Sequence, residues 1–303
     1  MSEETRTTPP FAPTASLKAA MSAFEEHMAR EGFSEHTIKA FLSDLNILGQ
    51  FVGIGQAVGD IGTKDLNDYL DWLQHGRGVP CNAKSLARRL TTLKVFFGWL
   101  TKTGVLEMDP AAPVTHKPVS TPLPKILKED EIERALAITQ ALRHPGAQGR
   151  PDARPHLLMT LLLQTGIKKG ECMNLTLNHL DFSDSDSPAV WIRYQDPRRR
   201  HKERKLRLLQ EWSAVFKEYQ AQHEIKDALF PCTARNLEYV LSDVAQAADL
   251  PDGISFEMLR WTSAVRDYKA KLPAERQRQK MGLSKASWRE VKVKLARLAQ
   301  PAL

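Results

Sequence analysis

Positively charged side chains recur at separated places in the second half of the chain. Lys168 follows a Thr-Gly corner, Lys202 lies in a basic turn, and Arg260 lies in the run LRWTSAVR. Between Arg266 and Arg297, eleven Lys or Arg residues stand against only three acids. A site that grips a phosphodiester needs cations from several elements, because one side chain neutralises only part of a phosphate and cannot orient it. The pattern indicates such a site, although scattered surface charge would give the same composition.

The stretch TGIKKGECMNL, residues 165–175, places Lys168 and Lys169 at the entrance of an expected helix. A helix start prefers negative charge, because its free N–H groups and its dipole already make that end positive. The two lysines therefore either point into solvent or serve an anionic partner that the helix N-terminus would also favour.

Length and charge set the broad class of the protein. The chain has 303 residues and is 42% hydrophobic, which is enough for a large core and favours two domains over one. Its formal net charge of +7 agrees with a polyanionic partner.

Cysteine spacing and hydropathy predict a cytoplasmic protein without a metal, a cofactor or a membrane segment. Cys81, Cys172 and Cys232 are far apart and show no CxxC spacing, so neither a disulfide framework nor a zinc site is indicated. The N-terminal MSEETRTTPP has no apolar segment of the signal-peptide kind, and the longest apolar run, LLMTLLL, is too short to cross a bilayer.

Amphipathic periodicity predicts a mainly helical chain in two domains. In SEHTIKAFLSDLNILGQFV, Ile38, Leu45 and Leu48 form one stripe behind Ser34 as N-cap, and NAKSLARRLTTLKVFFGWLTKTG begins behind Asn82. We expect a flexible arm at 1–14, a four-helix module at 15–107, a linker at 108–125 that holds five prolines, and a second domain at 126–303.

The second domain carries one patch with strand character. Within 188–208, PAVWIRY and RKLRL flank the basic turn QDPRRRHKE, which predicts a β-hairpin. Helices are expected at about 209–222, 234–248, 256–271 and 285–299.

Ordered motifs resemble the tyrosine recombinase and phage integrase family, close to its Xer-like members, from about residue 15 to 295. FSEHTIKAFLSDLNILGQFV and LARRLTTLKVFFGWLTKTGVLEMDPA resemble the core-binding module with its SAM-like fold. LLMTLLLQTGIKKGECMNLTLNHLDF, HKERKLRLL, ISFEMLRWTSAV and MGLSKASWREVKVKL resemble the catalytic domain. The resemblance implies a mainly helical fold with a small β-hairpin or sheet in the second domain, and a two-domain, C-shaped clamp on DNA.

The same resemblance implies a catalytic site whose residues have changed. In that family a tyrosine attacks a DNA phosphate to form a 3'-phosphotyrosyl link, while two arginines, a lysine and two histidine-type residues stabilise the transition state and move protons. Those positions are held here, in chain order and with the nucleophile last, by Lys168, Lys202, Glu257, Arg260, Leu283 and Lys292.

Each departure from the family pattern has a chemical meaning. Lys168 keeps a positive charge but loses the planar fork that binds two phosphate oxygens. Glu257 would bring a negative charge toward the phosphate, unless it pairs with Lys168 or Arg260 and neutralises the pocket. Leu283 can neither donate a hydrogen bond nor move a proton, and Lys292 cannot replace a tyrosine as the nucleophile.

DNA-contacting residues are expected in both domains. Lys84 and Arg88 lie four apart and share a face of a helix that faces the DNA major groove in the resembled family, although a solvated face would look the same. The expected contacts are Lys84, Arg88, Arg89, Lys94, Lys168, Lys202, Arg204 and Arg260.

The sequence thus predicts a duplex DNA-binding protein without strand cleavage. Its expected role is that of an accessory or regulatory subunit in site-specific recombination or mobile-element integration, in a homo- or hetero-oligomer with other tyrosine recombinases. Two alternatives stay open. One is an active recombinase with a rearranged site, for example one that uses Tyr268; the missing phenol argues against it. The other is a protein-interaction partner that has lost DNA affinity, against which the basic excess argues.

Overall fold

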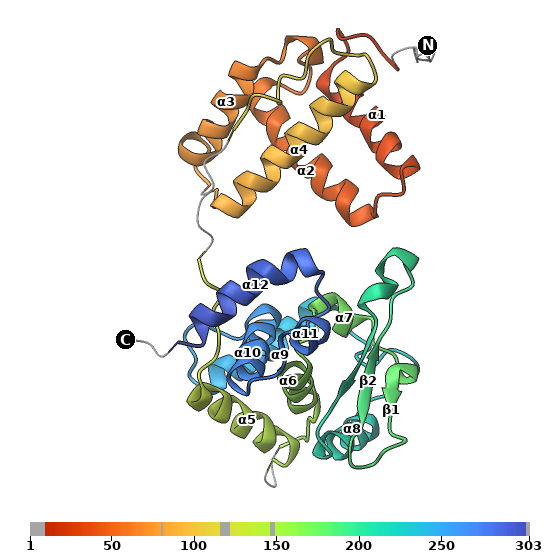
Figure 1. Ribbon diagram of the computed structural model, residues 1–303, viewed down its shortest axis with the longest axis vertical. Coiled ribbons are helices and arrows are strands. Elements are labelled where there is room, and N and C mark those ends of the chain that lie inside the picture. The colour runs from red at the N-terminus through yellow and green to blue at the C-terminus, as the bar shows by residue number, and fades with distance from the viewer. Residues whose placement is uncertain (1–9, 80, 116–121, 146–148, 301–303) are drawn as a thin grey trace. The chain divides into compact units, whose positions relative to one another are not determined.

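The computed structural model describes residues 10–79, 81–115, 122–145 and 149–300. The chain divides into two compact units, Met1–Pro122 and Leu123–Leu303, both mainly helical (Figure 1). The mainly helical fold with a small sheet in the second unit is confirmed. The arm predicted at 1–14 and the linker predicted at 108–125 lie partly outside the described residues.

The first unit packs its helices around α2. Its helices are α1 (Leu17–Arg30), α2 (Glu35–Val52), α3 (Thr63–Asp71) and α4 (Ala83–Lys102). The predicted caps are present, because Ser34 accepts the backbone N–H of Thr37 and Asn82 accepts that of Ser85. The helices α1, α3 and α4 each contact α2 and bury a common apolar core. Ala111 and Val114, after α4, are also buried in that core.

The second unit is built around an apolar helix. Its helices are α5 (Glu129–Arg143), α6 (Arg154–Thr165), α7 (Lys169–Met173), α8 (Glu211–Gln222), α9 (Ala234–Ala247), α10 (Phe256–Lys269), α11 (Ala274–Lys280) and α12 (Lys285–Leu298). Because α6 is apolar on most of its circumference, it lies inside the unit, in contact with α5, α8, α9 and α10.

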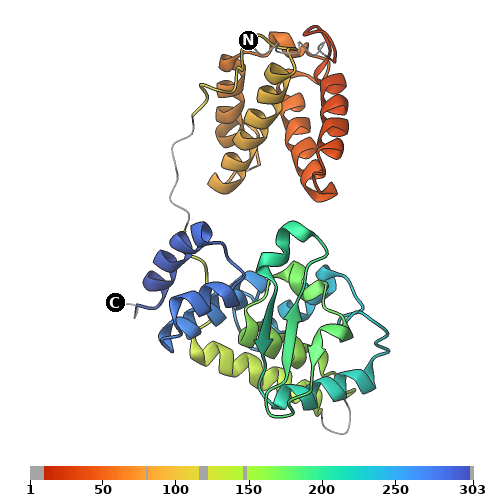
Figure 2. The same cartoon turned by 45° about the vertical axis from the view of Figure 1, so that its right-hand side comes forward.

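A three-stranded antiparallel sheet lies at one side of this helical unit (Figure 2). Its strands are β1 (Leu180–Asp181), β2 (Ala189–Ile192) and β3 (Arg204–Arg207), in that order. The predicted hairpin is confirmed, with Val190 opposite Leu206, and its basic turn forms the 3₁₀ helix Pro197–Lys202. The strand β1 was not expected, because two residues are too few to show a strand pattern.

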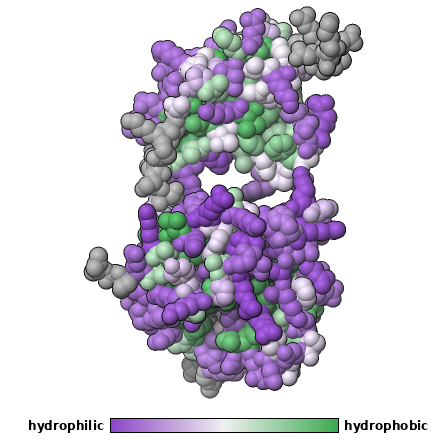
Figure 3. Space-filling model, viewed as in Figure 1, coloured by the Kyte–Doolittle hydropathy of each residue, from purple (hydrophilic) through white to green (hydrophobic). Residues whose placement is uncertain are grey.

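The C-terminal helices α11 and α12 flank α10. A small apolar cluster that includes Trp261, Val265, Met281 and Leu295 joins α12 to α10. The sequence did not predict α11, since AERQRQK has no apolar stripe. The visible face of the second unit is mostly hydrophilic, with small separate hydrophobic areas (Figure 3). Among the described helices, none is long and apolar enough to cross a membrane.

Candidate functional site

The corner between α6 and α7 brings Lys168 to Arg260. At the end of α6, Gly166 has a φ of 61°, in the left-handed region that favours glycine, and an added Cβ would lie 3.2 Å from the Ser263 hydroxyl. This tight turn presents the Gly166 carbonyl to α10, where the Arg260 Nη1 donates to it at 2.5 Å. Two residues later Lys168 becomes the N-cap of α7.

Arg260 is held by backbone carbonyls rather than by an acid. Its Nη2 donates to the Met281 carbonyl at 2.6 Å, opposite the bond to Gly166. Among the described residues no carboxylate lies within ion-pair distance of it. Burial lowers the pKa of Arg260, but an arginine begins so high that it remains charged. Its positive charge is therefore positioned without being neutralised.

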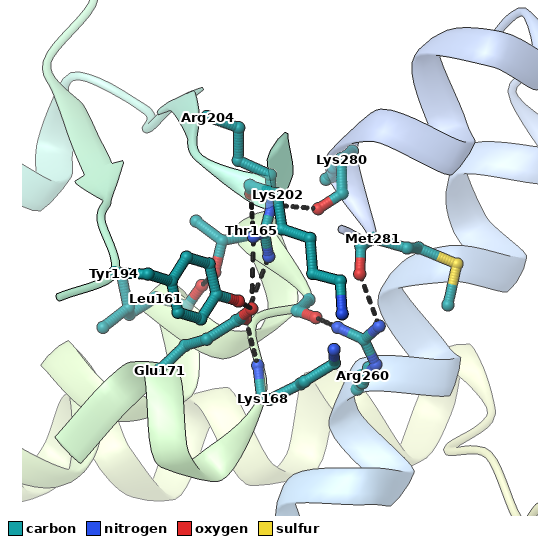
Figure 4. Close-up of polar contacts among 11 residues, drawn as sticks. Leu161, Thr165, Lys168, Glu171, Tyr194, Lys202, Arg204, Arg260, Lys280 and Met281 are labelled. Atoms are coloured by element: carbon teal, nitrogen blue, oxygen red, sulfur yellow. Dashed lines mark hydrogen bonds and ion pairs between the residues drawn. The ribbon is translucent and has the colours of Figure 1, made fainter. Parts of the chain in front are cut away.

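Two lysines add to this charge. Lys168 is half-buried, and burial lowers the pKa of its ammonium. The charge of Glu171 raises this pKa, whereas the charges of Arg260 and Lys202 lower it further. In Figure 4 the ammonium groups of Lys168 and Lys202 lie beside the Arg260 guanidinium. Three cations from α7, the hairpin turn and α10 thus meet at one place, which favours an anion there.

A buried ion pair supports this cluster. Arg204 donates to both carboxylate oxygens of Glu171, at 2.9 and 3.1 Å, and their side chains are 7% and 3% exposed. Burial alone would raise the pKa of Glu171, but the hydrogen bonds and charge of Arg204 outweigh it and lower that pKa to about 2. Glu171 also accepts from the backbone N–H of Lys168 at 2.8 Å and from the Tyr194 hydroxyl. Glu171 therefore fixes the start of α7.

Arg204 was expected to contact DNA directly, and its burial corrects that expectation. Besides Glu171, it donates to the carbonyls of Lys202, at 3.1 Å, and of Lys280, at 2.8 Å. It thereby ties the hairpin to α7 and to the end of α11, so it positions other cations. The signal in the sequence was strand alternation, because Arg204 is two residues from buried Leu206 and shares its face of β3.

Four of the six family positions line one cavity of about 750 Å³. They are Lys168, Glu257, Arg260 and Leu283. Lys202 lines an adjoining basic cavity of about 800 Å³, which also includes Leu283. Glu257 is exposed and forms no ion pair among the described residues, so the expected pairing with Lys168 or Arg260 is not formed. Its charge acts on Arg260 only by raising the pKa of that guanidinium, against the larger lowering by burial.

Lys292 is not brought into this cavity. It lines a separate groove of about 470 Å³ together with Tyr268 and Trp288, between α10, α11 and α12. The α12 residue that reaches the Lys168 cavity is Val291. Tyr268, the tyrosine considered for a rearranged site, is likewise absent from the lining of the cavity that holds Lys168 and Arg260.

The predicted basic face of α4 is only partly exposed. Lys84, Arg88 and Lys94 are exposed, as expected. Arg89 is only 9% exposed, and its Nη1 lies 2.7 Å from the Cys81 sulfur, so the expectation that it contacts DNA is corrected. The signal was helical spacing, because Arg89 lies three residues after Leu86 on the buried stripe.

Sequence reasoning missed Asp44, the buried acid beside these arginines. Its side chain is 2% exposed, forms an ion pair with Arg88, and lies 3.5 Å from the Arg89 Nε. The Thr92 hydroxyl also donates to it, at 3.0 Å. The sequence signal was its spacing, four residues before Leu48 on the buried stripe of α2.

Two further findings concern the basic turn before β3 and metal binding. The turn before β3 exposes Arg199, Arg200 and His201, and the Arg199 guanidinium lies 4.7 Å from the ring centre of Tyr194. In the described part of the chain, no group of three or more His, Cys, Asp or Glu side chains could hold a metal ion.

Comparison with known sequences gives two family matches. Residues 21–104 match the N-terminal SAM-like domain of phage integrase, and residues 125–285 match the phage integrase family. Tyrosine recombinase XerC of Mycobacterium sp. (strain JLS) is 31% identical over 169 residues, 55% of each chain. Tyrosine recombinase XerC of Mycobacterium leprae (strain TN) is 34% identical over 166 residues, 54% of each. The chain spans about half the length of these curated relatives.

Solved structures share the fold over most of this chain. A lambda integrase dimer bound to a COC' core site is 15% identical, with a TM-score of 0.71 over 95% of this chain and 80% of that one. The XerH site-specific recombinase bound to palindromic difH substrate, in a post-cleavage complex, is 16% identical, with a TM-score of 0.69 over 96% of each chain. At these identities the likeness concerns the two-domain fold alone.

Proposed function

Because the chain belongs to the phage integrase family, we propose that it binds duplex DNA and does not cut it. The cations around Lys168 and Arg260 meet the phosphate backbone, and the exposed cations of α4 make a second set of contacts. Phosphate contacts of this kind supply affinity and position rather than sequence selectivity. The protein then acts as an accessory or regulatory subunit beside active recombinases in site-specific recombination or mobile-element integration.

One observation carries the proposal that strand cleavage is lost: no tyrosine lines the cavity with Lys168 and Arg260 in the described structure. The chain has five tyrosines, all at described positions. Tyr69 lies in the core of the first unit, Tyr219 is buried in that of the second, and Tyr239 is exposed on α9 beside Arg235. Tyr268 lines the groove of Lys292.

Tyr194 is the tyrosine drawn near the cation cluster in Figure 4, and its chemistry is unfavourable for attack. Its hydroxyl donates to Glu171. Burial, and then the hydrogen bond to Glu171, raise the pKa of Tyr194. A phenol whose proton is held in this way is a poor nucleophile, because nucleophilic attack needs a lowered pKa or an adjacent free base.

The remaining family positions support the same proposal. Leu283 offers no proton-transfer group, and Lys168 offers a single point charge where the family has an arginine fork. Loss of one acid–base group typically lowers a rate by about 10²–10⁴-fold. Replacing Lys292→Tyr alone should therefore not restore cleavage.

The test is a search for a covalent protein–DNA adduct. Duplexes selected by the protein from a random pool are nicked to trap cleavage, incubated with wild type, Tyr268→Phe or Tyr194→Phe, and run on denaturing gels. We expect no adduct with any of them, while a recombinase with an intact tyrosine on its own site forms one. An adduct from wild type that disappears in Tyr268→Phe would instead identify an active enzyme with a rearranged site.

A further inference from the structure

The cavity that holds Lys168 and Arg260 is lined by two chemically different sets of residues. One set is charged and positive on balance, with Lys168, Lys169 and Arg260 against Glu238 and Glu257. The other is apolar and comes mainly from the start of α10, the turn before α12 and α12 itself: Ile254, Phe256, Trp261, Met281, Leu283 and Val291. The first four of these are at most 8% exposed. Among these six side chains, only Trp261 carries an N–H that could donate a hydrogen bond to a phosphate oxygen, so the other five have no use in a site for a phosphate group alone.

The interior of the cavity keeps a net positive charge. At the cavity edge, Lys169 and Glu238 neutralise each other at 2.8 Å, and both are about half exposed, at 50% and 48%. Glu171 is already bonded to Arg204. Glu257 also lines the cavity, but its single negative charge is outweighed by Lys168 and Arg260 together. Within the described chain, neither of these cations has a carboxylate within ion-pair distance, and their proximity to each other lowers the pKa of Lys168 further. An anion would relieve this repulsion.

The volume is that of a pocket for a small organic molecule. At about 750 Å³ the cavity lies within the range of ligand pockets, roughly 300–1,000 Å³, which are mostly apolar and carry a few convergent polar groups. Inorganic phosphate would occupy a small part of this space and leave the partly exposed Leu283 and Val291 in contact with water.

We propose that this cavity binds a small amphipathic anion: a phosphate monoester or a carboxylate that carries an aromatic or aliphatic group. The anionic head meets Lys168 and Arg260, and the apolar body lies against Trp261, Leu283 and Val291. One consequence rests on the proposed function: the bound anion takes the cations that a DNA phosphate would otherwise meet, so ligand and DNA compete.

Calorimetry of the full chain without DNA tests the ligand site by itself. The probes are 1-naphthyl phosphate, octyl phosphate and inorganic phosphate at equal ionic strength. We expect the two esters to bind at least about tenfold more tightly than inorganic phosphate, because only they bury apolar surface. Equal affinity for all three would overturn the proposal. The order of the two esters distinguishes an aromatic from an aliphatic preference.

Variants separate the two halves of the site. Lys168→Met should weaken all three probes, whereas Leu283→Asn should weaken only the esters, by about tenfold, and leave inorganic phosphate within about twofold. Lys269→Met, an exposed lysine that lines the other groove, is the matched control and should change nothing. Equal losses from Lys168→Met and Lys269→Met would contradict the site. Val291→Asn replaces Leu283→Asn if circular dichroism shows that the latter is unfolded.

A DNA-binding titration with and without 1-naphthyl phosphate tests the competition. We expect the midpoint to shift to higher protein concentration in wild type and not in Leu283→Asn. A ligand that binds in calorimetry but never shifts the midpoint would overturn the competition. If wild type bound no DNA at all, the proposed function would fail, while the calorimetric result on the cavity would stand.

Discussion

Both units bury a carboxylate against arginine, but they leave different amounts of free charge. In the first unit Asp44 pairs with Arg88 and lies 3.5 Å from the Arg89 Nε. In the second unit Glu171 is bonded to Arg204. There, Lys168 and Arg260 have no carboxylate within ion-pair distance in the described structure. The comparison teaches that a cation is available to an anion only where no buried acid already holds it.

The largest expected effect is the loss of the buried pair in the second unit. Glu171→Gln leaves Arg204 buried without a counter-charge, and breaking such a pair typically costs about 3–5 kcal/mol. Urea unfolding of the full chain, followed by tryptophan fluorescence, measures the loss. Glu238→Gln is the matched control in the same unit, because its pair with Lys169 is about half exposed and should contribute at most about 1 kcal/mol. Similar losses in both variants would contradict the supporting role of Glu171.

The same pair predicts acid sensitivity. The pKa of Glu171 is lowered from 4.5 to about 2, so its contribution is present above pH 4.5 and is lost as the pH falls toward 2, by about 3 kcal/mol. Glu171→Gln should remove this part of the acid unfolding. Burial lowers the pKa of His156 from 6.5 to about 4. The stability that depends on neutral His156 is therefore lost at higher pH, between those two values, and can be measured separately. An unchanged acid profile of Glu171→Gln below pH 4.5 would show that the pair does not titrate there.

The second expected effect concerns the first unit. Asp44→Asn leaves Arg89 buried without its acid, at a cost of about 1–3 kcal/mol, and frees the half-exposed Arg88 for DNA. The variant should therefore be less stable and yet bind duplex DNA more tightly. Asp68→Asn, which removes an exposed acid paired with Lys64 on α3, is the control for both measurements. Unchanged DNA affinity of Asp44→Asn would mean that Arg88 does not face DNA.

The third effect tests the exposed part of α4. Lys84→Glu with Lys94→Glu should weaken duplex binding and flatten its salt dependence, because the slope of log K against log salt changes by about 0.9 per lost phosphate contact. Fluorescence anisotropy at several salt concentrations measures both quantities. Arg6→Glu, in the predicted arm, is the control. A wild-type affinity that does not respond to salt would contradict DNA binding through phosphates.

The smallest expected effect is at the cavity edge. Glu257 is exposed beside the cations and forms no ion pair in the described structure, so Glu257→Gln should raise DNA affinity only about two- to fivefold. Glu211→Gln, an exposed acid on α8, should leave affinity unchanged. Weaker binding in Glu257→Gln would place this side chain away from the bound phosphate.

Periodic patterns were sufficient for most elements. Helices with a strong apolar stripe, such as α2 and α4, and the caps Ser34 and Asn82 follow from local spacing alone. The elements α11 and β1 have no such stripe, and local spacing did not predict them. Local spacing works where each turn buries the same face, and it says nothing about an element that is held by contacts with distant residues.

The sequence by itself determined which residues stand at the family positions, including Leu283 and Lys292, because motif order survives substitution. Only the tertiary structure decided which charges remain available. Arg89 and Arg204 are basic in sequence, but their partners Asp44 and Glu171 lie 45 and 33 residues away, on other elements. It also decided that Lys292 lines a different groove from Lys168. Charge depends on what lies within a few ångströms, and packing alone sets those distances.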